Sequence, residues 1–262
     1  MSTGGSSIRR IGFAVAAQLL AFCICLGGGE GRAPPRKQHG FEQVVHDARY
    51  LSRNLLKPKK RPKKKLFAVA GSTAFLYLTR EEIHDWVQDH RSSGRSRFLD
   101  DARTMGNAGF GSSIALLSYA ASLMTKNPRE KETALLILES MSYSAAAAYA
   151  GSYVLAAERP EEGTSIHIFD TRGHGVSLDV ALAASVIPPL RCQYLRVRPE
   201  DGRAKRFWKR AATVLLYSGA ALTAYQRMDR EQHWAPDVFL GFVTGHRVGR
   251  TLCEAHEPEI NP

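Results

Sequence analysis

The sequence predicts an all-α protein, a compact bundle of about six helices with its functional site at one end. Three observations lead to this class. Uncharged apolar runs of about 12 to 20 residues recur along the chain, Gly and Ser are frequent inside them, and the alternation typical of strands is sparse. With 262 residues and 44% hydrophobic content, the chain can bury one sizeable core and still carry an N-terminal extension.

Residues 1–29 have the composition of a signal peptide. Arg9 and Arg10 form a positive start, residues 11–26 are an uncharged apolar run, and three glycines follow where cleavage needs small residues. The paired arginines fit a twin-arginine signal poorly, and a retained N-terminal anchor is the alternative to cleavage. Either form predicts an exported protein, periplasmic or on the outer face of the cytoplasmic membrane.

Residues 30–65 are polar and basic, and they end in the run Lys57–Lys65. Because like charges repel one another and the prolines in the run oppose a helix, we expect a disordered linker. Its cations favour an anionic membrane surface, at about 1 kcal/mol per basic residue near the surface. A solvated linker without a partner is the alternative.

The formal net charge of +11 favours anionic partners. Phosphate esters and anionic lipids both fit this charge. No zinc-ligand spacing, helix-turn-helix signal or aromatic-studded strand pattern accompanies it, so no nucleic acid is predicted as a partner.

Residues 66–255 form the predicted helical domain, and its first half contains three apolar segments. Residues 66–90 combine an apolar run with an amphipathic stretch. Residues 106–125 carry no charge and form a helix that Asn127–Pro128 ends, and residues 130–158 form a helix rich in Ala and Ser. Residues 106–125 are long enough to cross a bilayer, but their Gly, Ser and Asn content favours a bundle lying against the membrane over a polytopic one.

The second half of the domain contains a loop and then three helices, at residues 161–172, 176–187, 211–225 and from 236 onward. Pro188–Pro189 closes the first of these helices. The last helix starts at Pro236 and carries Gly241, Gly245 and Gly249 at a spacing of four, which gives it one flat face for close packing.

The segment between the last two helices carries Arg227, His233 and Asp237. Because Pro236 suits the first turn of a helix, Asp237 lies where the helix dipole favours a carboxylate. That carboxylate can accept one imidazole N–H of His233 and free the other nitrogen for proton transfer or nucleophilic attack. Arg227 adds a planar cation suited to phosphate. By itself, this spacing also fits a helix start with a surface histidine.

Two elements, Arg159–Pro160 and Gly173–His174, precede this segment. The order of the three elements resembles the type 2 phosphatidic acid phosphatase and vanadium haloperoxidase superfamily, over about residues 100–250. The stretch that begins at His233 and runs through Trp234-Ala235-Pro236-Asp237 is the most specific part of the resemblance.

The resemblance implies a mechanism without a metal or another cofactor. In that family one histidine attacks phosphorus to form a phosphohistidine, a second protonates the leaving group, and cations hold the equatorial oxygens. It implies that His233 is the nucleophile with Asp237 as its orienting carboxylate, and that His174 is the general acid. Arg159, Arg227 and the turn at Gly173 correspond to the phosphate clamp.

The chain departs from the family pattern at three positions. Ser152 stands where the family has Lys, Arg172 stands where it has Ser two residues before His174, and Gln226 replaces a Ser. A guanidinium at Arg172 can take the place of the missing ammonium, because it reaches as far and can clamp two oxygens. The alternative is that Arg172 points to solvent and the clamp is one charge short.

The resemblance therefore implies a metal-independent phosphatase that acts on phosphomonoesters or lipid phosphates outside the cytoplasm. A non-catalytic phosphate- or membrane-binding protein that retains the fold is the alternative. A vanadate-dependent haloperoxidase uses the same pocket, but the chain is short for that class.

The four cysteines form no C-x-x-C pair and have no metal-site neighbourhood, so no metal is predicted. After removal of the signal, only Cys192 and Cys253 remain. An oxidising compartment would allow them to form a disulfide, although nothing in the sequence brings them together.

Overall fold

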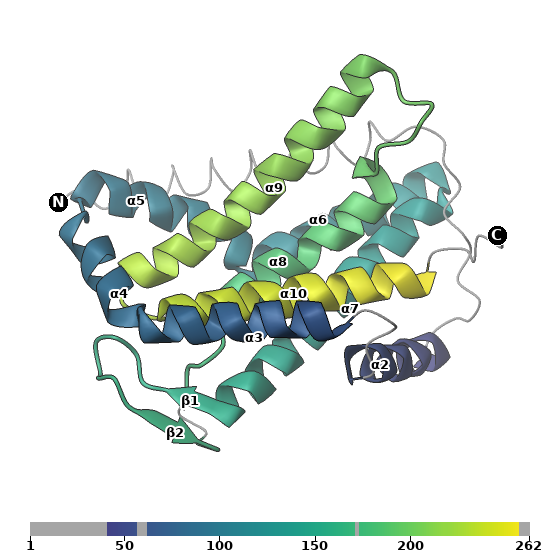
Figure 1. Cartoon of the computed structure of the whole chain (residues 1–262). Coiled ribbons are helices and arrows are strands. Elements are labelled where there is room, and N and C mark those ends of the chain that lie inside the picture. The colour runs from purple at the N-terminus through teal and green to yellow at the C-terminus, as the bar shows by residue number, and fades with distance from the viewer. Residues whose placement is uncertain (1–40, 57–61, 171–172, 257–262) are drawn as a thin grey trace.

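The computed structural model describes residues 41–56, 62–170 and 173–256, and it is almost entirely helical (Figure 1). The described elements are α2 (Phe41–Leu56), α3 (Pro62–Leu78), α4 (Arg80–Asp89), α5 (Ser93–Ala102), the 3₁₀ turn η1 (Arg103–Gly106), α6 (Ala108–Thr125), α7 (Pro128–Val154), β1 (Leu155–Ala157), β2 (Ile166–Ile168), α8 (Leu178–Leu190), the π turn η2 (Arg191–Leu195), α9 (Arg203–Asp229) and α10 (Ala235–His256).

The predicted all-α class is confirmed. The described part of the chain contains nine α-helices where about six are predicted, since α2, α4 and α5 join the six apolar ones. The predicted signal peptide at residues 1–29 and the side chains of the basic run Lys57–Lys65 lie outside the described residues.

Helix α8 is the centre of the bundle. Every residue from Val180 to Leu190 is buried, and α6, α7, α9 and α10 pack around this helix (Figure 1). A helix that is apolar on all sides is stable only inside a core. Side chains such as Ile114, Ile137 and Leu216 provide that core from α6, α7 and α9.

Helix α10 packs on α8 through the glycine face that the sequence predicts. A Cβ atom at Gly245 would lie 2.0 Å from the main-chain oxygen of Ala181, and Cβ atoms at Gly241 and Gly249 would meet main-chain oxygens next to or within α8 at 2.5 and 2.7 Å. No larger residue allows this approach. The contact holds the start of α10, and with it His233, against the start of α8.

Helix α8 continues through Pro188 and Pro189, where the sequence predicts its end. Pro189 lacks the N–H that would bond to the carbonyl of Ser185 one turn earlier. The hydroxyl of Ser140 on α7 donates to that carbonyl at 3.0 Å. A neighbouring helix therefore supplies the hydrogen bond that the proline removes.

The prediction of a disordered linker over residues 30–65 is wrong for two parts of that range. Residues 41–56 form α2, and α3 begins at Pro62. The side chains that α2 buries are Gln43, Asp47 and Leu51, which share one face. Two of the three are polar. Phe41, Val44, Ala48 and Leu51 do recur at helical spacing, but the buried face of α2 also carries polar side chains, whose partners come from α7 and α10.

A small hairpin replaces the end of the helix predicted over residues 130–158. Helix α7 ends at Val154, and β1 then pairs antiparallel with β2, inside the segment predicted as a loop. The main-chain N–H of His174 donates to the oxygen of Ala157 at 3.0 Å. The Gly-His turn thus lies on an extended segment, and the hairpin supports it.

Among the described helices, α6 alone is long and apolar enough to cross a membrane, and 39% of it is buried inside the bundle. Residues Leu66–Leu78 of α3 form a shorter apolar helix. Both helices expose large apolar side chains, namely Leu66, Phe67, Phe75 and Leu78 on α3, and Leu116, Leu123 and Met124 on α6.

Candidate active site

The two histidines that the sequence singles out lie side by side at the starts of α8 and α10. Their ring centroids are 6.3 Å apart, and the rings are close to perpendicular. Nδ1 of His233 lies 3.1 Å from the main-chain oxygen of His174. Because a carbonyl oxygen only accepts, Nδ1 carries a proton, and Nε2 is the nitrogen that holds the lone pair in the neutral form of the ring.

Asp237 lies beside His233 but does not make the hydrogen bond that the sequence predicts. Its Oδ2 is 3.6 Å from Nδ1 of His233, and it accepts from the main-chain N–H of Trp234 at 2.9 Å. A carboxylate in the first turn commonly bonds back to the start of its helix in this way. Asp237 therefore fixes the helix start and adds negative charge beside His233, while the His174 carbonyl sets the tautomer.

Arg227 and Arg159 reach the same region with donors that make no hydrogen bond to any described residue. Arg227, in the last turn of α9, is 9% exposed, and its Nε and Nη1 make no hydrogen bond within the described residues. Nε of Arg159 is also buried and makes no hydrogen bond to any described residue. Burial lowers the pKa of Arg227, and the charges of Arg103 and Arg159 add to that effect against Asp179. A buried charged donor without a hydrogen bond destabilises the protein, and a bound anion would remove this penalty by accepting the bond.

Arg103 is a third cation at this site, and it lies outside all three sequence motifs. Its Nε donates to Oδ2 of Asp179 at 3.0 Å. The same oxygen lies 3.2 Å from Nη1 of Arg227, an ion pair without hydrogen-bond geometry. One carboxylate from the first turn of α8 therefore lies between two guanidinium groups, where an incoming anion would compete with it.

Ser152, which stands where the family has Lys, has a structural role in this chain. Its hydroxyl donates to the main-chain oxygen of Val176 at 3.0 Å and accepts from the N–H of the same residue at 3.1 Å. These two bonds tie the end of α7 to the loop that carries His174. A lysine at this position could not make both of these bonds.

Gly173 lies against the hairpin, as a close main-chain approach requires. A Cβ atom there would lie 2.2 Å from Cα of Ala156. Glycine thereby lets the turn place His174 at the site. Arg172, the preceding residue, lies outside the described residues, so its contribution to the clamp stays a prediction.

Helix α5 anchors the end of α9 that carries Arg227. Nε2 of Gln226 donates to Oδ1 of Asp100 at 2.8 Å. Asp229, which is fully buried, accepts from the hydroxyl of Ser96 at 2.7 Å. Gln226 therefore orients the end of α9, and the guanidinium of Arg227 with it.

A cleft of about 660 Å³ opens beside His174. Its lining consists of Ala156, Ala157, Glu158, Glu162, Asp170, Gly173 and His174. Burial lowers the pKa of His174 below its ordinary value, and the charges of Arg159 and His233 lower it further, against Glu162 and Asp237. The group that faces the cleft is therefore an imidazole that readily gives up its proton.

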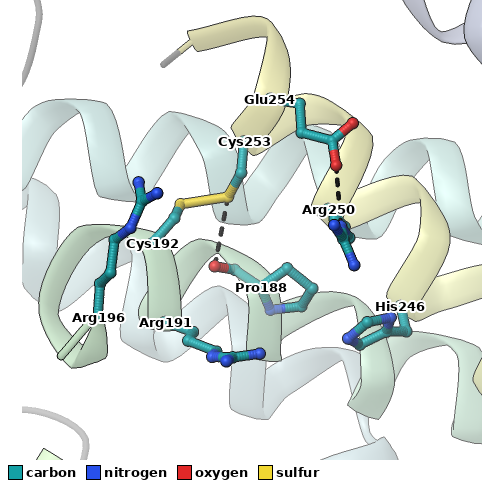
Figure 2. Close-up of a pocket in the computed structure, with 8 residues that line it drawn as sticks. All are labelled: Pro188, Arg191, Cys192, Arg196, His246, Arg250, Cys253 and Glu254. Atoms are coloured by element: carbon teal, nitrogen blue, oxygen red, sulfur yellow. Dashed lines mark hydrogen bonds and ion pairs between the residues drawn. A yellow bond between two sulfur atoms is a disulfide. The ribbon is translucent and has the colours of Figure 1, made fainter. Parts of the chain in front are cut away.

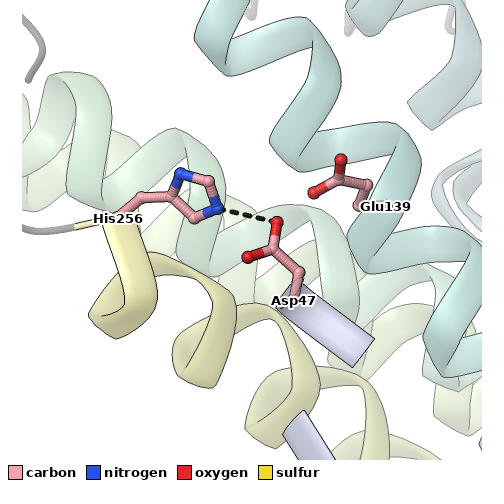
Figure 3. Close-up of side chains that lie close together, drawn as sticks. All are labelled: Asp47, Glu139 and His256. Atoms are coloured by element: carbon pink, nitrogen blue, oxygen red, sulfur yellow. Dashed lines mark hydrogen bonds and ion pairs between the residues drawn. The ribbon is translucent and has the colours of Figure 1, made fainter. Parts of the chain in front are cut away.

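A second cluster of titratable side chains lies at the other end of α10, where Asp47, Glu139 and His256 come within 4.8 Å of one another (Figure 3). Both ring nitrogens of His256 are engaged, at 2.9 Å from Asp47 and 3.0 Å from Glu132. Burial lowers the pKa of His256, but the hydrogen bonds and charges of the two carboxylates outweigh it and raise the pKa to about 9. The imidazolium of His256 itself supplies the positive charge between the carboxylates of Asp47 and Glu132.

Comparisons with protein-family models, with curated proteins and with solved structures each return no match for this chain.

Proposed function

We propose that this chain is a metal-independent phosphatase that acts on phosphomonoesters or lipid phosphates through a phosphohistidine. The observation that carries the proposal is a set of buried guanidinium donors on Arg159 and Arg227 that have no hydrogen-bond acceptor among the described residues, beside the pair His174 and His233. Buried charged donors of this kind are expected to face an anion. A histidine with a fixed tautomer beside a bound phosphoryl group is placed for nucleophilic attack.

In the first proposed step, Nε2 of His233 forms a bond to phosphorus while the ester P–O bond breaks. Protonated His174 gives its proton to the departing alkoxide, which leaves as an alcohol through the cleft. The guanidinium groups of Arg103, Arg159 and Arg227 stabilise the charge on the equatorial oxygens.

In the second step, neutral His174 takes a proton from water, whose oxygen attacks the phosphohistidine. The P–N bond breaks, inorganic phosphate leaves, and His233 and His174 return to their starting protonation states. His174 thus acts first as an acid and then as a base, and both histidines have their starting charges at the end of the cycle.

A lipid phosphate is the substrate that the surface beside the site favours. Phe75 and Leu78 on α3 are 64% and 79% exposed. Arg80, which opens the next helix, lies 5.2 Å from the ring centroid of Trp234, the neighbour of His233. An acyl chain could rest on this apolar surface while its phosphate reaches the arginines. Attachment to an anionic membrane and export rest on the sequence alone.

Non-catalytic phosphate binding is the second candidate function. The lowered pKa of His174 favours it, because an unprotonated histidine cannot serve as general acid until a bound anion raises its pKa. The loss of the family's Lys at Ser152 also favours it.

Hydrolysis of an aryl phosphate and of phosphatidic acid in detergent micelles, by the full chain in excess chelator, tests the proposal. We expect turnover of both, inhibition by vanadate, and loss of activity in His233→Ala. Vanadate binding without turnover would favour the second candidate, and activity that survives His233→Ala would contradict the phosphohistidine.

A further inference from the structure

A second pocket, of about 300 Å³, lies between the end of α8 and the C-terminal half of α10 (Figure 2). Its lining consists of Pro188, Arg191, Cys192, Arg196, His246, Arg250, Cys253 and Glu254. A disulfide joins Cys192 on the π turn to Cys253 on α10, and so links the two walls of the pocket. The sequence leaves this pairing open, and the structure forms it.

The pocket lies far from the candidate active site. Cys253 follows Ala235, the first residue of α10, by 18 residues. At the rise of an α-helix, this places the two regions about 27 Å apart along the helix axis. One small ligand cannot reach both, so whatever binds here occupies a separate site.

Positive charge dominates this pocket. Three guanidinium groups, those of Arg191, Arg196 and Arg250, face one carboxylate, Glu254. That carboxylate is already engaged, since Nε of Arg250 donates to Glu254 at 2.8 Å. The side chain of Arg191 makes no hydrogen bond or ion pair with any other described residue.

The state of His246 agrees with this excess of charge. Burial lowers the pKa of His246, and the charges of Arg250, Arg191 and Arg247 lower it further. Nε2 of His246 is paired with the hydroxyl of Tyr217 at 2.8 Å. His246 therefore lines the pocket without adding positive charge, and the arginines supply the charge that would attract an anionic ligand.

We propose that this pocket is a second, non-catalytic site for a phosphate group. Planar guanidinium groups bind the tetrahedral oxygens of phosphate in pairs, as an ammonium group does not. The ligand is either free phosphate or the phosphate of a lipid headgroup, since both present the same oxygens. The disulfide links the two walls of the pocket, one of which carries Arg191 and the other Arg250.

Binding of inorganic phosphate to the full chain, followed calorimetrically, tests the site. Arg191→Gln combined with Arg250→Gln should weaken this binding event about tenfold or more while hydrolysis of an aryl phosphate is unchanged. Arg203→Gln, an exposed arginine at the start of α9, removes the same kind of charge outside the pocket and should change neither. Phosphate binding that is identical in the double variant and the parent protein would overturn the proposal.

Glu254→Gln tests the site in the opposite direction. It removes the carboxylate that competes for Arg250, so phosphate should bind several-fold more tightly, a gain that only a folded protein can show. Weaker or unchanged phosphate binding in Glu254→Gln would count against the site.

Vesicles separate the two sources of the phosphate. Flotation with phosphatidylcholine vesicles is compared with and without phosphatidic acid, for the parent and for the Arg191→Gln, Arg250→Gln variant. A lipid headgroup is the ligand if phosphatidic acid increases flotation of the parent alone. Free phosphate is the ligand if flotation is equal for both proteins but calorimetric phosphate binding differs.

Discussion

The main-chain oxygen of His174 and Nδ1 of His233 lie 3.1 Å apart, so the proposed general acid fixes the tautomer of the proposed nucleophile through its own backbone. This relationship makes the position of one histidine depend on the other. It also gives Asp237 a smaller role than that of an orienting carboxylate in direct contact, because Asp237 bonds to Trp234.

Asp237→Asn should therefore lower kcat by about tenfold or less, since the amide oxygen can still accept from the Trp234 N–H. A carboxylate that alone sets the tautomer of a catalytic histidine costs about 10⁴-fold when it becomes an amide. His233→Ala, measured alongside in the same phosphatase assay, should abolish turnover. A loss in Asp237→Asn as large as that in His233→Ala would mean that the carboxylate orients the imidazole directly.

Arg103→Gln should weaken vanadate binding by about three- to tenfold, because it removes one of the three cations around the phosphoryl site while leaving the other two. Inhibition constants for vanadate measure the effect. Arg97→Gln, an exposed arginine on the neighbouring helix α5, is the matched control and should leave vanadate binding unchanged.

Adding Ser152→Lys to Arg103→Gln should not restore the binding. The hydroxyl of Ser152 holds Val176 through two hydrogen bonds, and a lysine there breaks both. Recovery of vanadate affinity in the double variant would show that the family's position for the cation still functions in this chain.

The pH profile of kcat/KM should fall as the pH rises toward neutrality. His174 acts as an acid only when it is protonated, and its pKa lies below the ordinary value of 6.5. Activity is therefore retained below that pKa and lost as the pH passes through it. Glu162→Gln should move this limb to lower pH and Arg159→Gln to higher pH, because the first charge raises the pKa of His174 and the second lowers it. A limb that stays fixed in both variants would remove His174 as the titrating acid.

Contiguous apolar residues explain why most of the fold could be predicted. Helix α8 is buried on every side from Val180 to Leu190, so its sequence is a plain apolar run. Helix α2 contains no such apolar run, and two of the three side chains that it buries, Gln43 and Asp47, are polar. Their burial depends on His256, which lies more than two hundred residues later in the chain.

The same limit applies to the candidate site. His233 and Arg227 lie in one local motif whose spacing a sequence displays. Arg103 and Asp179 belong to no motif, and only the packing of η1 and α8 against the end of α9 brings them together. Spacing alone also does not show whether Asp237 accepts a hydrogen bond from the imidazole of His233 or from a main-chain N–H, and in the structure the donor is the N–H of Trp234.

Gly245→Ala should destabilise the protein by about 1–3 kcal/mol, since its Cβ would force α10 away from the main chain of α8. Gly94→Ala is the matched control, because a Cβ there meets nothing within 4 Å. In a helix that substitution should stabilise by a few tenths to about 1 kcal/mol. Urea unfolding of both variants measures the difference, and equal stabilities would mean that the glycine face does not set the approach of the two helices.

The attachment of α2 should depend on pH through His256. The pKa of this histidine is raised from 6.5 to about 9, so its contribution to stability is complete below 6.5 and is lost as the pH rises through 9. Burial raises the pKa of Asp47, but its bond to His256 and the charge of that imidazolium lower it to about 2. The same ion pair is therefore also lost as the pH falls through 2. The protection factors for hydrogen exchange in α2, which compare each rate with that of the unstructured chain at the same pH, should be highest between about pH 4 and 6.5.

His256→Gln should lower the hydrogen-exchange protection factors of α2 at pH 6 and remove most of their decrease toward pH 9. The effect is specific because the imidazolium joins Asp47 of α2 to Glu132 of α7, and a neutral amide cannot replace its charge. His46→Ala is the matched control. That ring is 52% exposed at 3.1 Å from the same aspartate, so solvent screens its contribution and exchange in α2 should barely change. If the two variants behave alike, α2 is held by its apolar contacts around Leu51, and the buried ion pair contributes little to its attachment.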